Sequence, residues 1–323
     1  MRRRQFLSGL TSYTALASAA WLTACAPTPP LTVAIYPWIG YETLYLADEF
    51  DWLPASVRLQ QGRTASDSLA ALQAGQVDAA CLTLDEVLRV RATGMPLTVA
   101  LVFDVSAGAD IVLARPTIHR LADLAGKRIG FEQNALGALM FNKLLDAAQL
   151  PASALTPVDL PPDRQLAAWR NHEVDVVVTY EPFATLLQHE GAQHLFDTRQ
   201  IPDTVFDVLA VRTDRAKDRQ ANLRALLVGH FRAIKHLRTN RLDAIYRIAA
   251  HQGIKPNEVQ QALAGVVLPT LPTNRNYYLA SHDARLTRAA RTLSALMVQR
   301  GLLPREDTLE GLLTPDWLPR EEE

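Results

Sequence analysis

Short apolar runs alternate with amphipathic stretches through most of the chain. In the first half, the runs suited to buried strands cover residues 31–35, 57–59, 77–82 and 97–103. Apolar residues recur at helical spacing between these runs, and Gly75 and Gly94 end two of the helical stretches. This alternation predicts an α/β fold in which mainly parallel sheets carry helices on both faces.

The same pattern repeats after a central stretch, residues 103–132, in which Pro116 ends a strand at 111–114. The later strand-like runs cover residues 128–131, 156–160, 174–179 and 192–196. The segments Gln76-Val-Asp-Ala-Ala80 and Glu173-Val-Asp-Val-Val177 correspond to each other, because each follows an amphipathic helix and leads into a polar turn. The repeat predicts two related lobes that present equivalent loops to a shared cleft.

A long apolar run at 205–211 predicts a further strand, which we expect to run back beside the strand at 111–114. Two hinge strands would then join the lobes. After Asp214 the pattern is predominantly helical. We therefore expect lobe 1 to consist of residues 31–112 and 206–323, including a helical C-terminal region, and lobe 2 to consist of residues 113–205.

The first 24 residues have the pattern of an export signal peptide. Three arginines at positions 2–4 precede an apolar run that is too short and too rich in small residues for a good membrane-spanning helix. Leu22-Thr-Ala-Cys25 resembles the lipobox of bacterial lipoproteins, which implies a lipid anchor, with palmitate, on Cys25 and a tether at 25–30. The alternative is an ordinary signal peptide with an incidental cysteine. Arg3-Arg-Gln-Phe-Leu7 also resembles a twin-arginine motif, so the export route stays open.

Charge and reactive residues exclude several functions. Removing residues 1–24 takes away three arginines and no acids, so the formal net charge changes from −1 to −4, which argues against nucleic acid as a partner. Cys81 lies in an apolar run, which predicts a buried, inert thiol. The eight histidines lie outside the predicted cleft loops, and the chain has no H-E-x-x-H, G-x-S-x-G or cysteine cluster. We therefore expect no catalytic residue, metal or cofactor.

Four groups of residues match a known family. They are Trp38-Ile-Gly-Tyr41, Gly75-Gln-Val-Asp78, Leu121-Ala-Asp-Leu-Ala-Gly-Lys-Arg-Ile-Gly130, and Asp175 with Tyr180-Glu-Pro182. In these residues the chain resembles the extracytoplasmic solute-binding proteins of ABC importers, in the nitrate, sulfonate, taurine and thiamine-pyrimidine-precursor group. The resemblance implies a two-lobe periplasmic binding protein fold of type II, which closes on its ligand. It also implies a periplasmic monomer at a bacterial membrane, with an ABC permease and its ATPase as partners.

Ligands of open α/β sheets bind beyond the carboxyl ends of the strands. The ligand-binding candidates in the loops at those ends are Trp38, Tyr41, Ser66, Thr83, Asp85, Asp104, Ser106, Glu132, Gly137, Tyr180, Glu181 and Asp207. Trp38 and Tyr41 offer flat faces for a ring or a cation, or else pack in the core. Asp85 and Glu181 open helices, where the helix dipole alone accounts for an acid.

Two further loops have alternative interpretations. The segment Asn134-Ala-Leu-Gly137 starts a helix, whose N–H groups either bind an anionic part of the ligand or are simply capped. Asp104 and Asp110 either face the ligand or brace the hinge loop, and bracing is the role that we expect of Asp110.

The charged residues of the candidate loops are all acids, with no Lys or Arg among them. A nitrate or sulfonate site is expected to offer positive charge. The sequence therefore favours a neutral or amine-bearing organic solute, such as a heterocycle, captured by the binding protein of an ABC importer. The alternatives are a sensory protein that reports its ligand to a membrane signalling partner and, less favoured, an enzyme on the same fold.

Overall fold

The computed structural model describes residues 29–133, 136–280 and 283–320. The predicted signal peptide, Cys25 and Asn134 lie outside these residues. None of the described helices has both the length and the apolar character that a membrane span requires.

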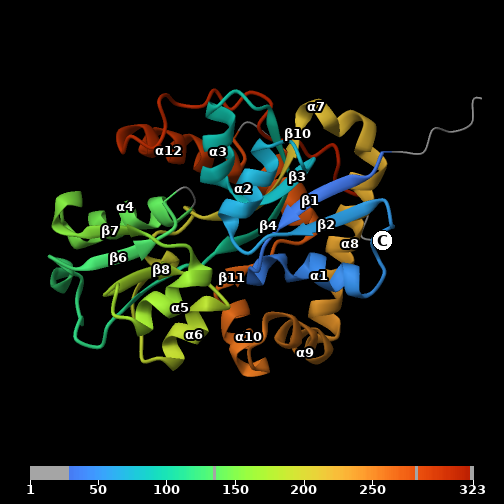
Figure 1. The fold of residues 1–323 in the computed structure, drawn as a ribbon. Helices are drawn as coiled ribbons and strands as arrows, with labels where there is room; N and C mark the ends of the chain where they lie inside the picture. The colour runs from blue at the N-terminus through green and yellow to red at the C-terminus, as the bar shows by residue number, and fades with distance from the viewer. Residues whose placement is uncertain (1–28, 134–135, 281–282, 321–323) are drawn as a thin grey trace, which may run out of the picture.

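The described residues form two β-sheets, one in each lobe (Figure 1). The first sheet has the order β11-β4-β10-β3-β1-β2, and its strands are β1 (Leu31–Ile35), β2 (Val57–Gln61), β3 (Ala79–Thr83), β4 (Leu97–Ser106), β10 (Phe206–Arg212) and β11 (Val266–Val267). The second sheet has the order β7-β6-β8-β5-β9, and its strands are β5 (Ile111–Ala114), β6 (Arg128–Phe131), β7 (Thr156–Asp159), β8 (Val176–Thr179) and β9 (Gln193–Asp197).

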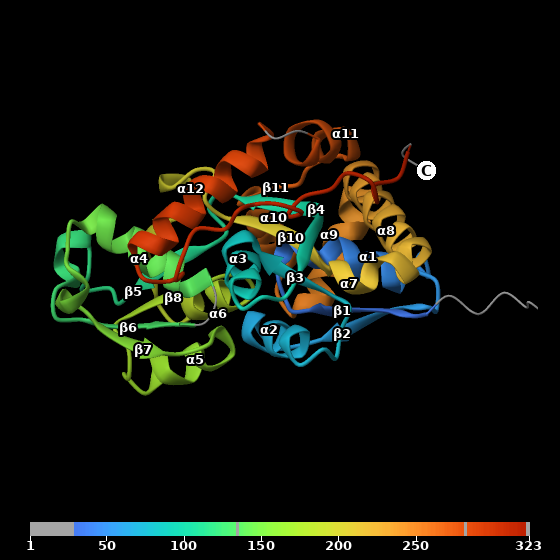
Figure 2. The ribbon, with the colours of Figure 1, turned by 90° about the horizontal axis from the view of Figure 1, so that it is seen from above.

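Helices cover the sheets of both lobes (Figure 2). The helices of the first lobe and the C-terminal region are α1 (Glu42–Glu49), α2 (Ala65–Gln73), α3 (Leu84–Ala92), α7 (Thr213–Ala216), α8 (Gln220–Thr239), α9 (Arg241–Gln252), α10 (Pro256–Ala264), α11 (Leu271–Thr273) and α12 (Arg285–Gln299). Those of the second lobe are α4 (Leu136–Ala148), α5 (Pro162–Arg170) and α6 (Phe183–His189). Shorter helical turns are η2 (Ile39–Tyr41), η3 (Leu121–Leu124), η4 (Ala152–Ala154), η5 (Thr198–Gln200), η6 (Lys217–Arg219) and η7 (Asn274–Leu279).

In each sheet, the strand that enters from the other lobe runs against its neighbours. In the first sheet β10 is antiparallel to β3 and β4, whereas β1 is parallel to β2 and β3. In the second sheet β5 is antiparallel to β8 and β9, whereas β6 is parallel to β7 and β8. The sheets are therefore mixed, and the carboxyl ends of most strands in each sheet lie at one edge.

The sequence repeat has a structural counterpart. Asp78, just before β3, accepts a hydrogen bond from the backbone N–H of Thr32 in β1 at 3.1 Å. Asp175, just before β8, accepts one from the backbone N–H of Arg128 in β6 at 2.9 Å. β1 and β3 therefore correspond to β6 and β8, and in each lobe the residues that follow these strands face the cleft.

The expected pairing of the strand at 205–211 with the strand at 111–114 is wrong. β10 lies between β3 and β4, and β5 lies between β8 and β9. The chain crosses between the sheets at 107–110 and 198–205, where the N–H of Ser106 donates to the carbonyl of Val205 at 3.0 Å. All of β5 belongs to the second sheet, so the lobe boundary predicted at residue 112 falls within that strand. An apolar run predicts a buried strand but does not specify which strands it pairs with.

The inner strands of both sheets are largely buried, including all of β5 and β8 in the second sheet. Every residue of β3 and of β4 is buried, including Cys81. Burial raises the pKa of the Cys81 thiol well above its usual range, so it stays protonated at neutral pH. The prediction of a buried thiol is confirmed.

Candidate ligand-binding site

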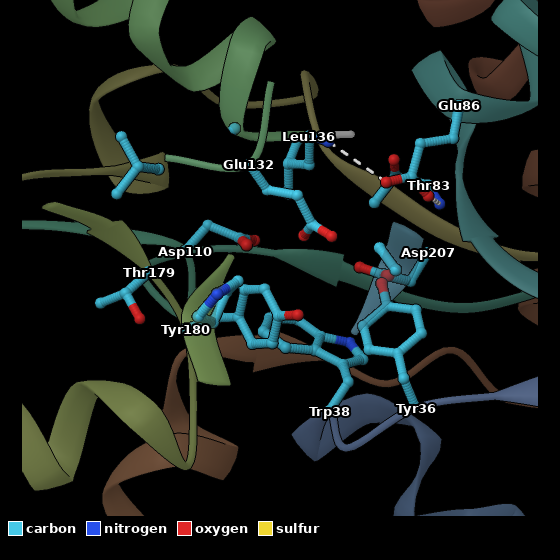
Figure 3. A pocket seen from close by; sticks show the side chains of 14 residues that line it. Tyr36, Trp38, Thr83, Glu86, Asp110, Glu132, Leu136, Thr179, Tyr180 and Asp207 are labelled. Atoms are coloured by element: carbon cyan, nitrogen blue, oxygen red, sulfur yellow. Dashed lines mark hydrogen bonds between the residues drawn. The ribbon is translucent and has the colours of Figure 1, made fainter. Parts of the chain in front are cut away.

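A cavity lies between the lobes and is lined from both (Figure 3). Its lining residues are Tyr36, Trp38, Ala65, Thr83, Glu86, Asp110, Glu132, Leu136, Gly137, Pro162, Val178, Thr179, Tyr180 and Asp207. The space open to the centre of a water molecule is about 20 Å³. That is room for about one water molecule, so the lobes are closed on each other in this structure.

Aromatic rings form one side of the cavity, opposite the carboxyl groups of Asp110 and Glu132 (Figure 3). Trp38 and Tyr36 follow β1, and Tyr180 follows β8 in the other lobe. The ring of Tyr180 meets that of Trp38 edge to face at 5.6 Å between centroids, and that of Tyr36 at 6.0 Å. Such pairs contribute about 0.5–1.5 kcal/mol each beyond the area they bury, so this cluster helps to hold the lobes together.

A pair of aspartates lies at the base of the cavity. The strand register places Asp207 of β10 beside Asp104 of β4 on one side and Thr83 of β3 on the other. Tyr41 Oη donates to Asp207 Oδ1 at 2.7 Å, and Trp38 Nε1 donates to Asp104 Oδ2 at 3.0 Å. The other oxygen of each carboxyl group receives no hydrogen bond from an N–H or hydroxyl group of the described residues. The register sets the two carboxyl groups side by side, and a proton on one of them, donated to the other, would satisfy both oxygens.

Burial dominates the electrostatics of this pair. It raises the pKa of Asp104 to about 8, and the pKa of Asp207 rises well above its usual range through burial and the neighbouring Asp104. Two carboxylates side by side away from water repel each other strongly, so one of the two keeps its proton at neutral pH.

Four more buried carboxyl groups surround the cavity. Burial raises the pKa of Asp110 to about 7 and that of Glu86 to about 8, and it also raises those of Asp85 and Glu132. With Asp104 and Asp207 they make six acids, each at most 5% exposed. These six residues are called the acidic cluster below.

The acidic cluster has little positive charge to balance it. Among the described residues, none of the six forms an ion pair with Lys, Arg or His. The charge of Arg89 bears on the cluster, because it opposes the effect of burial on the pKa of Asp85. Its guanidinium reaches the carbonyl of Gln133 in the other lobe at 3.4 Å but does not line the cavity.

Two glutamates of the acidic cluster connect the lobes by capping helices reciprocally. Glu132 of the second lobe accepts a hydrogen bond from the N–H of Ser66, in the first turn of α2, at 2.9 Å. Glu86 of the first lobe accepts one from the N–H of Leu136, the first residue of α4, at 3.2 Å (Figure 3). A carboxylate at a helix N-terminus is favourable, and these two bonds require the closed arrangement.

The sequence matches a family profile over residues 43–242, which is more than half of the chain. The family is described as NMT1/THI5 like. The chain belongs to the NMT1/THI5-like family. A search of curated protein sequences gave no match.

Solved structures similar to this NMT1/THI5-like chain have the same fold. The alkanesulfonate-binding protein SsuA from Xanthomonas axonopodis pv. citri, bound to MOPS, superposes with a TM-score of 0.72 at 20% identity, covering 90% of this chain and 98% of that one. The ligand-binding component of an ABC-type import system from Staphylococcus aureus gives 0.74 at 13% identity, with 90% and 97% coverage. The aliphatic sulphonate-binding SsuA from Escherichia coli gives 0.70 at 18% identity, with 88% and 91% coverage. The predicted periplasmic binding protein fold is confirmed.

The structure brings half of the sequence-predicted site residues together in the cavity of this NMT1/THI5-like chain. The predicted residues that line it are Trp38, Thr83, Glu132, Gly137, Tyr180 and Asp207. Tyr41 and Asp104 lie behind them, bonded to Asp207 and Trp38. Asp85 accepts a hydrogen bond from the Thr83 hydroxyl at 2.7 Å.

The other predicted residues have different roles. Ser66 contributes its backbone N–H to Glu132. Ser106 lies at the crossing between the lobes, where its hydroxyl is 2.8 Å from that of Thr198 and accepts from the N–H of Asp110 at 3.2 Å. The N-terminal N–H of α4 at Leu136 is bonded to Glu86, so the described part of that helix start does not present this group to an anionic ligand.

The polar lining residues missing from the predicted set are Tyr36, Glu86, Asp110 and Thr179, and the apolar ones are Ala65, Leu136, Pro162 and Val178. For Asp110, bracing of the hinge loop was the favoured one of two predicted roles, and the structure places this residue in the cavity lining. The sequence does contain a signal for Glu86, because Thr83-x-x-Glu86 is a capping-box pattern. In the structure, Glu86 Oε2 accepts a hydrogen bond from the N–H of Thr83 at 2.8 Å. Tyr36 and Thr179 lie at the carboxyl ends of their strands, and the same position identified the other candidates.

Glu181 is not among the residues that line the cavity. Its carboxylate accepts hydrogen bonds from the N–H and the hydroxyl of Thr185 at 3.1 and 3.0 Å, so it caps the start of α6. We expect Glu181→Gln to leave solute affinity within about twofold and to lower the free energy of unfolding by about 1 kcal/mol, the typical value of such a bond. Calorimetric titration and thermal unfolding check both parts, and a large loss of affinity would return Glu181 to the binding site.

Gly40 allows the backbone to pass close to Asp104. A Cβ at this position would lie 1.7 Å from Asp104 Oδ2 and 2.7 Å from Trp38 Nε1. Gly40→Ala must therefore displace the indole or the carboxyl group, and we expect it to cost about 1–3 kcal/mol of stability and to weaken solute binding. Thermal unfolding and solute titration measure the two effects. Wild-type behaviour in both would show that the Trp38–Asp104 contact is dispensable.

Proposed function

We propose that the chain is the solute-binding protein of an ABC importer, which captures a small amine-bearing organic cation between its lobes and delivers it to a permease and its ATPase. Heterocyclic amines fit best. The family, and a fold shared with the ligand-binding component of an import system, support the solute-binding role. The observation that carries the choice of solute is the acidic cluster, which has no ion-pair partner among the described residues.

The charges around the cavity favour a cation over an anion. Buried carboxyl groups are costly to ionise unless a counter-charge is close. An ammonium group in the cleft would supply that charge. It would lower the pKa values of the nearby carboxyl groups, which would then release protons. A sulfonate or nitrate would instead meet the four acids of the lining, Glu86, Asp110, Glu132 and Asp207, and Arg89 is not among the lining residues.

The shape of the cavity supports a flat solute. The rings of Tyr36, Trp38 and Tyr180 form one wall, and stacking or cation–π contact is the usual use of such a surface. Asp110 Oδ2 and Thr179 Oγ1 are buried atoms of the lining that lack a hydrogen-bond partner within the described chain. They are available to a solute that donates hydrogen bonds.

The two lobes would have to move apart to make room for the solute. The two crossings at 107–110 and 198–205 are the segments that a hinge rotation would bend. A solute that contacts both lobes would favour the closed state, because it gains those contacts only there. The reciprocal caps at Ser66 and Leu136 would stabilise the same closed state.

Binding, rather than catalysis, suits the groups present. No His, Cys or Lys of the described chain lines the cavity. We further propose a monomer that is exported to the periplasm and anchored in a bacterial membrane through lipid on Cys25.

The test is a thermal-shift panel on protein freed of bound solute. We expect aromatic and heterocyclic amines to stabilise the protein, by about 2.7 kcal/mol at a hundred times the dissociation constant. Nitrate and alkanesulfonates should give no shift. A shift with those anions alone would refute the cationic solute but keep the binding role, whereas no shift with any solute would count against both.

A further inference from the structure

Helix α8 exposes a row of cations at one end of the first lobe. Arg224, Arg232, Lys235 and Arg238 are exposed and lie on one face, because their spacing of eight, three and three residues follows the helical repeat. Arg241, the first residue of α9, is also exposed. The 20 residues of α8 include no Asp or Glu. These five residues are called the basic row below.

The basic row is not neutralised by neighbouring acids. Within the described chain, none of the five forms an ion pair: the nearby acids Glu49 and Asp243 pair with Arg247 instead. Arg232 lies over the ring of Trp52, with Cζ 4.3 Å from its centroid, which leaves the guanidinium at the surface. A mature chain with a formal net charge of −4 therefore concentrates unpaired positive charge on one helix.

The chain enters the fold beside this helix. Asn222 Nδ2, in the first turn of α8, donates to the carbonyl of Pro29 at 2.8 Å. Arg219 Nε donates to the carbonyl of Pro30 at 3.1 Å. Figures 1 and 2 agree that α8 and the start of the described chain lie at the same end of the molecule, away from the second lobe.

The proposed lipid anchor brings this end to the membrane. Four residue steps separate Cys25 from Pro29, so the anchor can be at most about 14 Å from Pro29. Helix α8 is about 30 Å long, and lying flat it would bring the whole basic row to the headgroups. The Debye length at physiological salt is about 8 Å, so cations held this close to the membrane are attracted to anionic headgroups despite screening by salt.

We propose that the exposed face of α8 docks on anionic phospholipid headgroups beside the anchor. The first lobe then rests on the membrane, and the second lobe points away from it. Each Lys or Arg near an anionic surface strengthens binding roughly fivefold. The proposal rests on the proposed lipid on Cys25 and is independent of which solute the cleft takes.

The experiment uses the whole lipidated chain, inserted through its own anchor into vesicles of phosphatidylcholine with or without phosphatidylglycerol. A donor dye is placed on α8 through Ala221→Cys or on the second lobe through Ser153→Cys, both at exposed positions, and an acceptor dye on the lipid. We expect energy transfer from position 221 to be higher with phosphatidylglycerol than without it. Added salt should abolish this difference, and position 153 should show low transfer throughout.

Two matched variants decide the role of the basic row. Changing Arg224, Arg232, Lys235 and Arg238 together to Gln should reduce transfer from position 221 to the value in phosphatidylcholine alone. Changing the exposed Arg164, Arg288, Arg291 and Arg305 to Gln removes the same net charge elsewhere and should leave transfer unchanged.

Three results would overturn the proposal. Equal transfer from position 221 in the two lipids would do so, as would a variant of the basic row that keeps the lipid-dependent transfer. If that variant keeps the lipid-dependent transfer but no longer supports solute import, the basic row binds a protein partner instead. A chain that does not float with the vesicles refutes the anchor, and with it this docking, while the solute site is judged by its own titration.

Discussion

Asp207→Asn is expected to stabilise the solute-free protein and to lower its affinity for the cationic solute by about 100-fold. Both effects come from the same carboxyl group. In the free protein Asp207 is buried beside Asp104, so a neutral amide removes repulsion and can still accept from Tyr41 and donate to Asp104. In the complex, the solute loses a buried charge partner, a change that typically costs 2–5 kcal/mol.

Thermal unfolding and calorimetric titration measure the two effects, which have opposite signs. The matched control is Asp104→Asn, alone and combined with Asp207→Asn. The two stability gains should not add, because either substitution already removes the repulsion. An Asp207→Asn protein that is less stable and binds the solute normally would contradict the acidic-cluster account.

Stability of the solute-free protein is expected to fall as the pH rises from about 4 to about 8. Burial raises the pKa of Asp110 to about 7, and those of Glu86 and Asp104 to about 8. Unfolded carboxyl groups ionise near pH 4, so between these values the folded state holds more protons than the unfolded state. The stability that these protons contribute is complete below about pH 4 and is lost through the folded pKa values, at about 1.4 kcal/mol per pH unit for each proton held.

Chemical denaturation across this pH range tests the expectation. A saturating cationic solute should flatten the fall, because it stabilises the ionised carboxylates. Solute uptake at pH 6 should also release protons, which titrations in buffers of different ionisation enthalpy detect. Stability that rises steadily from pH 4 to pH 8 would show that the acidic cluster is ionised and balanced by groups other than the solute.

Local patterns predicted the fold well because each strand and helix leaves a periodic signature. The repeated Val-Asp segments around Asp78 and Asp175 even located the corresponding strands of the two lobes, since each aspartate binds the backbone of a neighbouring strand. The pairing of β5 and β10 was not predictable in this way. Which strands a buried apolar run pairs with depends on where the chain crosses between the lobes.

The binding site was predicted only in part, for the same reason. The rule that ligands lie beyond strand ends found Trp38, Thr83 and Tyr180. It also selected Glu181, whose side chain folds back to cap its own helix, a choice that the sequence does not reveal. The Asp104–Asp207 pair arises from the register of two strands 100 residues apart in sequence and is visible only in the structure.

Calorimetric titration of solute-free protein with two compounds that share a ring and differ in charge tests directly whether the acidic cluster selects a cation. Aminomethylpyridine and pyridinesulfonate are such a pair. We expect the amine to bind, with release of protons near neutral pH, and the sulfonate to give no heat of binding. Binding of the sulfonate with no response to the amine would contradict the claim that the acidic cluster selects a cation.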